Sequence, residues 1–379
     1  MLIFFMIPVC EPLLDGNEEK YALDAIRSNW IASSGRYITE LEARLSTYCG
    51  VKFGVACSSG TSALHLACLA LKIGSGDEVI IPSFTLIVSA NVVILSGAKP
   101  VLVDVNPNTW CMDPKKIEEK VTRRTKAIMV VHMYGHPCDM DAILAIARKY
   151  HLKVIEDCAE AHGAEYKGKK VGGIGDIGCF SFYGNKILTS GEGGLLVTND
   201  KKAADFAKLL RNQAFEEPRF EHHHIGFNYR LTNLQAAVAF AQSEKIDEKV
   251  ERKRTIAALY TKLLSRESDL TLPVEMPDCK NVYWMYGVLL GDSYPTKEEV
   301  MKALYKNGVE TRSFFCPMNQ QPVFKNVKRD LYPDISGSYP VSEHLYRRGL
   351  YLPSGLGLND SQIQEVAKKL LACRKARAV

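Results

Sequence analysis

The chain has no segment typical of a nucleic-acid-binding arm, a membrane span or a signal peptide. Its net charge is only +5 over 379 residues and no basic block stands out, so we expect no nucleic-acid partner. The apolar stretch at residues 1–10 is much shorter than the roughly 20 residues that cross a bilayer, and it lacks a basic start and a small-residue cleavage site. We therefore expect no membrane contact and interpret this stretch as a short extension before the first turn of the fold.

Pairs of cysteines with zinc-type spacing are also missing. The eleven cysteines are scattered singly, and several lie in apolar runs, where a thiol behaves as a small hydrophobic group. This usage favours a reducing compartment, and we expect a cytoplasmic protein. The run His222–His224 has only Glu221 as a close acidic neighbour, and adjacent side chains on an extended chain alternate sides, so we expect no metal site.

Short apolar runs alternate with helical patterns through the first two-thirds of the chain. One helix is predicted to begin at Ser62, because apolar residues follow at the spacing of one helical face, and another is predicted over residues 140–150. Strands alternating with helices predict an α/β fold with a mostly parallel, seven-stranded sheet. The predicted strands are residues 53–57, 79–81, 100–103, 127–132, 154–156, 179–182 and 195–198.

The pattern changes after residue 233. One long helix is predicted over residues 234–264, with the charge run DEKVERKR in solvent, followed by strands over 283–290 and 309–313 and a helix over 297–307. This is typical of a smaller α+β domain. We predict a large domain over residues 1–245, whose N-terminal segment could also pack on the small domain, and a small domain over residues 246–379.

Two glycine-containing segments suggest binding of an anion. GGIGDIG (172–178) contains a GxGxxG match, but these glycines precede a predicted strand instead of following one, so we interpret them as a turn and not as a dinucleotide-binding loop. SSGTSALHLACLAL begins at the end of a strand and leads directly into a helix. Its free N–H groups and Gly60 suit a phosphate, although an ordinary serine N-cap would explain the same residues.

Two further segments place reactive groups at strand ends. LKVIEDCAEAHGA delivers Glu156 and Asp157 at the carboxyl end of a strand, the edge where α/β sheets bind ligands. SFYGNKILTSGEGG places Lys186 just after another strand, before a glycine-rich loop. A phosphate-binding helix start, an acid and a primary amine match the phosphate, the pyridine nitrogen and the aldehyde of pyridoxal 5'-phosphate (PLP). We therefore predict a PLP site in which Lys186 is the reactive amine. The alternatives are a structural aspartate at position 157 and, for Lys186, a solvated loop charge or a phosphate clamp.

These segments, with NWIASSGRYI and GFNYRLTNLQAA, resemble the PLP-dependent nucleotide-sugar aminotransferases of fold type I, the DegT/DnrJ/EryC1/StrS family, from about Ile7 to the C-terminus. Within the family they are most similar to the perosamine-forming subgroup. The resemblance implies transfer of an amino group from L-glutamate, through pyridoxamine phosphate, to C4 of a nucleotide-linked 4-keto-6-deoxyhexose. Products of the GDP-perosamine type and of the UDP- or dTDP-viosamine type both remain open.

The resemblance also implies roles for individual residues. Lys186 would form the Schiff base and move the proton, and Asp157 would pair with the pyridine nitrogen. Asn228 would reach the cofactor of the neighbouring subunit, so the active unit would be a homodimer with shared sites. The implied phosphate contacts are Gly60, Thr61 and Ser181.

Two positions depart from the common pattern of the family. Leu86 stands where many members stack an aromatic ring on the cofactor, and Phe84 is a candidate to compensate. Glu160 stands where glutamine is common, and we expect it beside the cofactor. Segments that contact substrate in the family correspond here to Trp30, Ser34, Arg36 and Arg312, where either arginine could pair with a pyrophosphate or form a surface ion pair. His224 lies near GFNYR, which favours a place in the sugar pocket or at an interface, and His132 and His162 are candidate neighbours of the pocket.

Two other functions compete with this prediction. A PLP-dependent sugar dehydratase of the same family would carry histidine in place of Lys186. A non-catalytic PLP-fold protein that binds or regulates would be consistent with Leu86, although Lys186 and Asp157 both argue against it.

Overall fold

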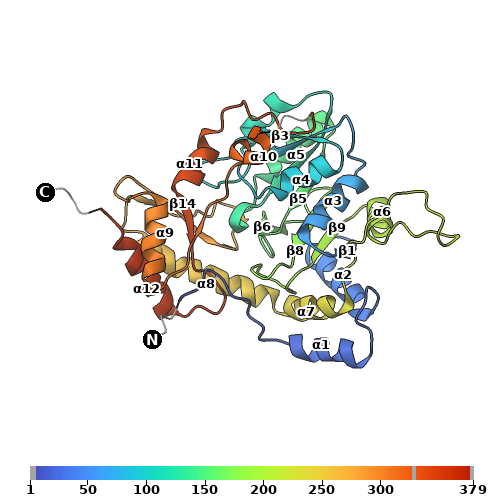
Figure 1. Cartoon of the computed structure of the whole chain (residues 1–379), viewed down its shortest axis with the longest axis horizontal. Coiled ribbons are helices and arrows are strands. Elements are labelled where there is room, and N and C mark those ends of the chain that lie inside the picture. The colour runs from blue at the N-terminus through green and yellow to red at the C-terminus, as the bar shows by residue number, and fades with distance from the viewer. Residues whose placement is uncertain (1–5, 327–329, 376–379) are drawn as a thin grey trace.

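The computed structural model describes residues 6–326 and 330–375 and is built around a seven-stranded sheet (Figure 1). The strand order is β1-β9-β8-β5-β4-β2-β3, and only β9 runs antiparallel to its neighbours. The predicted α/β fold with a mostly parallel sheet is confirmed. The strands are β1 (Phe53–Cys57), β2 (Glu78–Pro82), β3 (Lys99–Val103), β4 (Thr125–Val131), β5 (Lys153–Asp157), β8 (Ile177–Ser181) and β9 (Gly194–Thr198).

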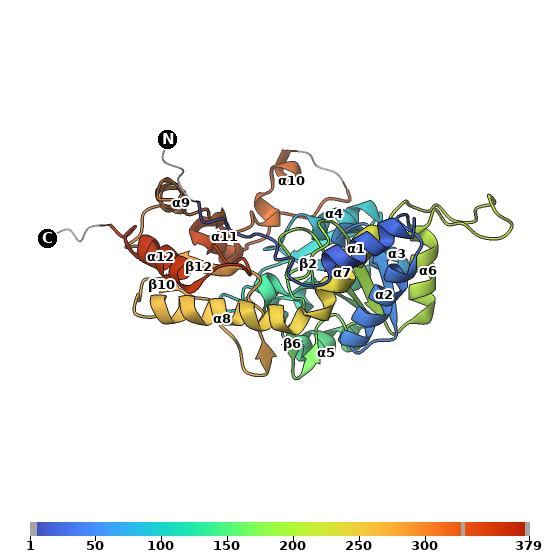
Figure 2. The same ribbon diagram turned by 90° about the horizontal axis from the view of Figure 1, so that it is seen from below.

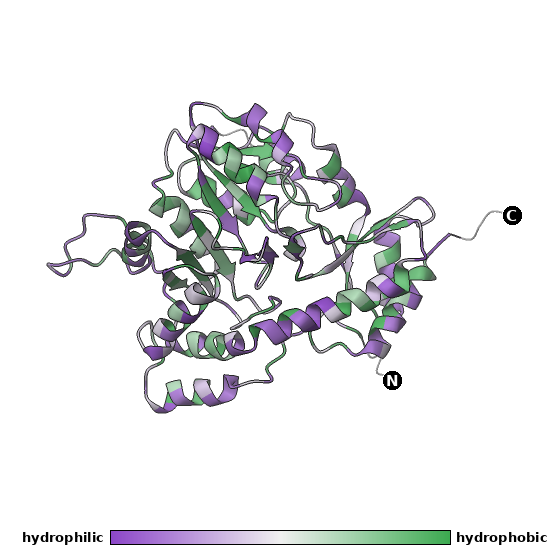
Figure 3. Ribbon diagram, turned by 180° about the vertical axis from the view of Figure 1, so that it is seen from behind, coloured by the Kyte–Doolittle hydropathy of each residue, from purple (hydrophilic) through white to green (hydrophobic). Residues whose placement is uncertain are grey.

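Helices cover both faces of this sheet, which explains why its strands are almost continuously apolar (Figure 3). Alternate side chains of one strand enter opposite cores: Val79 and Ile81 of β2 pack with one set of helices and Ile80 with the other. The first set is α3 (Gly60–Ala70), α4 (Val88–Leu95) and α6 (Lys201–Arg211), and the second is α2 (Arg36–Tyr48), α5 (Met140–Tyr150) and α7 (Asn233–Glu244).

A second sheet of four antiparallel strands, in the order β10-β12-β14-β13, forms a separate core with α8, α9 and α12 (Figure 2). Ile7 belongs to this core and its backbone pairs with Val309. The domain division near residue 245 stays a prediction. The elements are α8 (Ile246–Leu264), β10 (Leu270–Thr271), β12 (Tyr286–Leu290), α9 (Lys297–Lys306), β13 (Arg312–Ser313), β14 (Gly349–Leu352) and α12 (Asp360–Leu371).

The remaining elements are short or lie at the edges of the two sheets. They are α1 (Glu18–Arg27), α10 (Pro322–Asn326), α11 (Pro340–Arg348), the small sheet β6 (Glu165–Tyr166), β7 (Lys169–Lys170) and β11 (Cys279–Lys280), and the 3-10 turns Pro114–Lys116, Glu118–Lys120, Met133–Gly135 and Met318–Gln320. Within the two described ranges no helix combines the length and the apolar character that a membrane span requires. The expectations for residues 1–5 and 376–379 lie outside the described residues.

The prediction of one helix over residues 234–264 is wrong, because the backbone breaks at Lys245 (φ −110°, ψ 19°) between α7 and α8. The charge run in α8 is also not fully solvated. Lys249 and Lys253 are 4% and 2% exposed, and Lys253 Nζ donates to the carbonyl oxygens of Trp284 (2.8 Å) and Ser354. The predicted strand over 283–290 starts only at Tyr286, and the predicted strand over 309–313 is confined to Arg312–Ser313.

Candidate active site

A cavity of about 290 Å³ lies at the carboxyl ends of strands β1, β4, β5 and β8. Seven of the eight residues predicted to contact a cofactor line it: Gly60, Thr61, Leu86, Asp157, Glu160, Ser181 and Lys186. The eighth, Asn228, is exposed on the segment between α6 and α7, which projects from the rest of the chain (Figures 1 and 2). The parallel sheet thus brings together groups that are up to 126 positions apart in the chain.

The start of α3 forms one wall of the cavity. Ser59 caps the helix, since its hydroxyl accepts from Ser62 N (3.1 Å) and Ser62 Oγ accepts from Ser59 N (2.9 Å). The serine cap and an anion site are compatible, because the cap uses only the N–H group of Ser62, and the N–H groups that precede it in the first turn have no acceptor within the helix. A Cβ on Gly60 would lie 2.7 Å from Ser181 Cβ, so glycine is needed for the helix start to approach β8.

The two acids at the end of β5 have different surroundings. Asp157 faces the cavity and accepts one backbone hydrogen bond, from Ala159 N (3.1 Å). Burial raises the pKa of Asp157, while that N–H group and the charge of Lys186 oppose the rise. The carboxylate of Asp157 therefore has free acceptor capacity that a cationic ligand group could use.

Glu156 is instead surrounded by protein donors. Its oxygens accept from His132 Nε2 (3.1 Å) and from the N–H groups of Gly172 (2.9 Å), Ile174 (2.8 Å) and Gly175 (2.6 Å). Burial alone would raise the pKa of Glu156, but the hydrogen bonds, first that from His132, lower it overall. The glycine-rich segment is thus confirmed as a turn, and its N–H groups bind a carboxylate of the same chain.

His132 is held by this arrangement and does not line the cavity. Its Nδ1 accepts from Cys138 N (3.0 Å), so its Nε2 carries the proton that is donated to Glu156. His162 lies closer to the candidate amine; burial, and then the charge of Lys186, lower the pKa of His162 to about 3. At neutral pH His162 is therefore uncharged.

Lys186 is the candidate amine. Its Nζ lies 3.8 Å from the centroid of the Trp284 ring. Burial lowers the pKa of Lys186, and the charges of Glu160 and Asp157 oppose that fall. Burial also raises the pKa of Glu160 to about 7, although Lys186 and a hydrogen bond from Tyr134 N (2.8 Å) favour its charged form. An amine with a lowered pKa beside two carboxyls with raised pKa is an arrangement suited to proton transfer.

Sequence reasoning missed several residues that line the cavity. They are Tyr183, Asn185, Glu192, Trp284, Phe315 and Tyr351. The first three belong to the segment that carries Lys186, which was the signal available for them, whereas the last three come from distant segments without a motif. Leu86 lines the cavity and is 47% exposed, whereas Phe84 is buried against Phe314 (5.8 Å between ring centroids) and does not line it, so Phe84 does not compensate for Leu86.

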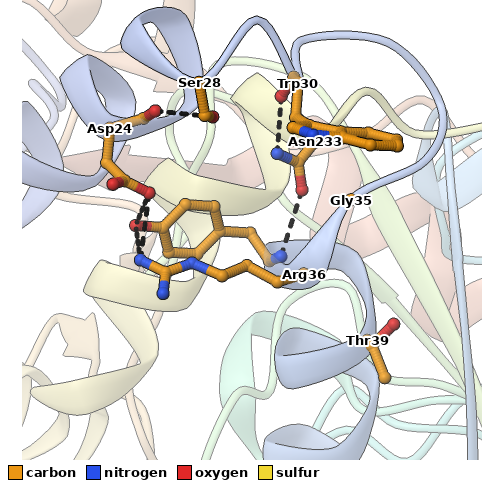
Figure 4. Close-up of a pocket in the computed structure, with 8 residues that line it drawn as sticks. Asp24, Ser28, Trp30, Gly35, Arg36, Thr39 and Asn233 are labelled. Atoms are coloured by element: carbon orange, nitrogen blue, oxygen red, sulfur yellow. Dashed lines mark hydrogen bonds and ion pairs between the residues drawn. The ribbon is translucent and has the colours of Figure 1, made fainter.

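Within one chain the candidate substrate residues lie outside this cavity. Trp30 and Arg36 line a separate open pocket of about 620 Å³, where Arg36 points toward Asp24 (2.9 Å) and Asn233 Nδ2 donates to Trp30 O (2.6 Å) (Figure 4). Ser34 is exposed in the loop before α2.

His224 and Arg312 are also outside the cavity. His224 packs on Phe206 (5.2 Å between ring centroids) in the projecting segment. Arg312 is 60% exposed and pairs with Glu310 (3.1 Å), but its backbone lies opposite Tyr351, which does line the cavity.

Comparison with known proteins shows the family to which the chain belongs. Residues 12–371 match the DegT/DnrJ/EryC1/StrS aminotransferase family. The chain is 46% identical over 367 residues to GDP-perosamine synthase of Caulobacter vibrioides (96% of this chain, 97% of the relative) and 42% identical over 365 residues to GDP-perosamine synthase of Escherichia coli O157:H7 (96% and 97%). Its fold is similar to S. venezuelae DesV in complex with a ketimine intermediate, at a TM-score of 0.88 and 32% identity over 95% of both chains. The chain belongs to the DegT/DnrJ/EryC1/StrS aminotransferase family.

Proposed function

We propose that this aminotransferase moves an amino group from L-glutamate to C4 of a GDP-linked 4-keto-6-deoxyhexose, giving a 4-amino-4,6-dideoxy sugar of the perosamine type. The observation that carries the proposal is the buried Lys186 amine, which lines one cavity with Asp157 and with the open helix start at Gly60. The similarity to two GDP-perosamine synthases supports the choice of substrate. A UDP- or dTDP-linked sugar of the viosamine type is the second candidate.

The cavity fits PLP in its charge distribution. Thr61 and Ser181, with the N–H groups at Gly60, would hold the phosphate, because a helix N-terminus and hydroxyl groups suit an anion. Asp157, whose carboxylate has free acceptor capacity, would hold the pyridine nitrogen, and Lys186 would bond to the aldehyde. Leu86 would cover part of the ring, and Glu160 would lie beside it.

When bound, PLP supplies an electron sink for the electron pair of a C–H bond next to nitrogen. Lys186 would take that proton from the α-carbon of the amino donor and deliver it to the cofactor's C4′, and its lowered pKa favours the neutral form that accepts a proton. The charged form of Asp157 would keep the pyridine nitrogen protonated. Trp284 and Phe315 would exclude water from the amine, since both line the cavity.

We also propose a cytoplasmic homodimer with shared sites. In one chain the exposed apolar side chains Leu86 (47%), Tyr183 (51%) and Ile225 (88%) surround the candidate site or lie in the projecting segment. A second subunit would cover them, and its Asn228 would then reach the phosphate. Mixing Lys186→Ala and Asn228→Ala proteins, each inactive alone, should restore activity through hybrid dimers; no recovery after verified subunit exchange would exclude shared sites.

Trp30, Ser34, Arg36, His224 and Arg312 are the proposed contacts to the nucleotide and sugar. In one chain Arg36 and Arg312 pair with acids, but both guanidinium groups are mostly exposed and can exchange partners. A PLP-dependent dehydratase is disfavoured by Lys186, and a non-catalytic protein is disfavoured by Lys186 and Asp157 together.

The test is direct. Purified protein is incubated with L-glutamate and, separately, GDP-, UDP- and dTDP-linked 4-keto-6-deoxyhexose, and the product is identified by mass and NMR. We expect a 4-amino sugar with the GDP substrate and none with Lys186→Ala protein. Equal turnover by Lys186→Ala would refute the assigned role of the amine, and product only from the UDP- or dTDP-linked sugar would select the viosamine type.

A further inference from the structure

The contact between Lys186 and Trp284 joins two distant parts of the chain. Among the residues that the structure describes, the Lys186 amine has no hydrogen-bond or salt-bridge partner, and it lies over the indole face at 3.8 Å from the ring centroid. A buried ammonium over an indole is the strongest common form of cation–π contact. Lys186 reaches the cavity because it follows β8, so the contact with Trp284 has a separate role.

Trp284 is buried and its ring makes two further contacts. It is 3% exposed, its Nε1 donates to Asn185 O (2.7 Å), and its ring lies against that of Tyr134 (6.3 Å, 28°). Asn185 is the residue directly before Lys186, so the same indole binds both the backbone and the side chain of this short segment. The ring therefore defines where the amine can rest.

Lys253 fixes the backbone of Trp284. This lysine is 2% exposed, forms no salt bridge with any described residue, and donates to Trp284 O (2.8 Å) and to Ser354 O. Burying a lysine with only carbonyl partners is costly, since burial disfavours its charge. Through these two hydrogen bonds Lys253 joins α8 to the segment before β12 and to the segment after β14.

The charged and titratable groups around the Lys186 amine come from several segments. Those whose charges act on the amine are Asp157 and Glu160, at the end of β5 and just beyond it, and Cys10 in the N-terminal segment, while the charge of Lys186 acts on His162. Tyr183, Glu192 and Tyr351 line the same cavity. The two acids and the indole face all favour the ammonium form of the amine.

We propose that Trp284 is a positioning residue for Lys186: its indole face holds the ammonium that forms when Lys186 has taken a proton, and Lys253 keeps the indole in place through the Trp284 carbonyl. The inference rests on the proposed role of Lys186. It concerns the amine of the cofactor-free protein, however, and so it can fail or succeed independently of which sugar the enzyme uses.

The experiment measures the pH dependence of acetylation of Lys186 by acetic anhydride in cofactor-free protein, site by site, by mass spectrometry. Only the neutral amine reacts. Trp284→Leu should lower the pKa of Lys186 by about one unit and raise labelling about tenfold below that pKa, as expected for a desolvated cation–π contact. The matched control is Trp110→Leu, since Trp110 is also 3% exposed and packs on Tyr134 (6.1 Å) but has no recorded contact with Lys186. An unchanged pKa in Trp284→Leu, or an equal shift in both variants, would overturn the proposal.

A second series covers the case in which Trp284→Leu does not fold. The chain has only three tryptophans, so all can be replaced by fluorinated tryptophans that weaken the attraction of the ring for cations with little change in size. The pKa of Lys186 should fall with each added fluorine, and this dependence should vanish in Trp284→Phe protein; a pKa that is constant across the series contradicts the proposal. Lys253→Met should also lower the pKa of Lys186, but by less than Trp284→Leu does. A wild-type pKa of Lys186 in Lys253→Met protein would show that Lys253 does not help to position the indole.

Discussion

Glu156 and Asp157 are neighbours in the chain, both are buried, and both end the same strand, yet their environments are opposite. Glu156 accepts hydrogen bonds from a histidine and three backbone N–H groups, whereas Asp157 accepts one. The difference arises because successive side chains of a strand point to opposite faces, so one enters the core beside the glycine-rich turn and the other enters the cavity.

This contrast separates a structural acid from a candidate catalytic one. A buried carboxylate whose lone pairs all accept hydrogen bonds from the protein has a structural role. A carboxylate in a cavity that still has lone pairs without a donor can bind a ligand. The pKa directions agree, since hydrogen bonding lowers the pKa of Glu156 and burial raises that of Asp157.

The largest effect is expected for Asp157→Asn. An amide cannot keep the pyridine nitrogen protonated, so kcat should fall about 1,000-fold, as when a charge placed for the transition state is removed. The midpoint of thermal unfolding should stay near the wild-type value or rise, because a buried charge is removed. Steady-state kinetics and thermal melts of the same preparation measure both; near-normal kcat would show that another group serves the nitrogen.

Glu156→Gln should show the reverse pattern. The amide group would place N–H donors opposite the N–H groups of the turn, so the free energy of unfolding should fall by about 3 kcal/mol. Urea denaturation measures this loss. Protein that remains folded at low temperature should retain most of its kcat, and a kcat loss as large as that of Asp157→Asn would end the distinction between the two acids.

The sequence predicts elements that depend on local patterns, but not features that depend on contacts between residues far apart in the chain. The sheet strands were recognisable because each is a local apolar run buried on both faces. The break at Lys245 was not, since neither glycine nor proline marks it and each half is a plausible helix. The burial of Lys253 depends on carbonyls 31 and 101 residues away, which no local pattern of charge reveals.

The candidate site shows the same limit. Lys186, Asp157 and Gly60 were predictable because each follows a strand, and carboxyl ends of parallel strands meet at one edge. Tyr351 lies in β14 of the second sheet and Trp284 lies just before β12. Only the packing of the second sheet on the first brings these two side chains to the cavity. The glycine-rich turn was recognised as a turn, but its carboxylate ligand was not, because Glu156 was grouped with Asp157.

The pH dependence of stability should distinguish the two kinds of acid. Burial raises the folded-state pKa of Glu160 from 4.5 to about 7, so its contribution to stability is full below pH 4.5 and is lost as the pH rises to 7. For Glu156, whose folded-state pKa is lowered, the contribution is present above its unfolded-state pKa and is lost as the pH falls. In cofactor-free protein, Glu160→Gln should remove about 2 kcal/mol of the decline between pH 4.5 and 7. If urea titrations of that variant show a decline in the free energy of unfolding as large as that of the wild type, groups other than Glu160 cause the decline.

The smallest effect on stability is expected where an acid is exposed instead of buried. Asp24 and its partner Arg36 have side chains that are 48% and 61% exposed, and such pairs contribute less than about 1 kcal/mol because water screens them. Arg36→Ala should therefore leave the free energy of unfolding nearly unchanged.

The same variant should change substrate binding. If the Arg36 guanidinium leaves Asp24 to bind a pyrophosphate, KM of Arg36→Ala protein for the nucleotide sugar should rise about tenfold while kcat is retained, since the guanidinium binds ground state and transition state alike. Asp24→Asn is the matched control, because it frees Arg36 without removing it and should leave KM equal or lower; a KM increase in both variants would place the effect in the pocket wall and not in the guanidinium.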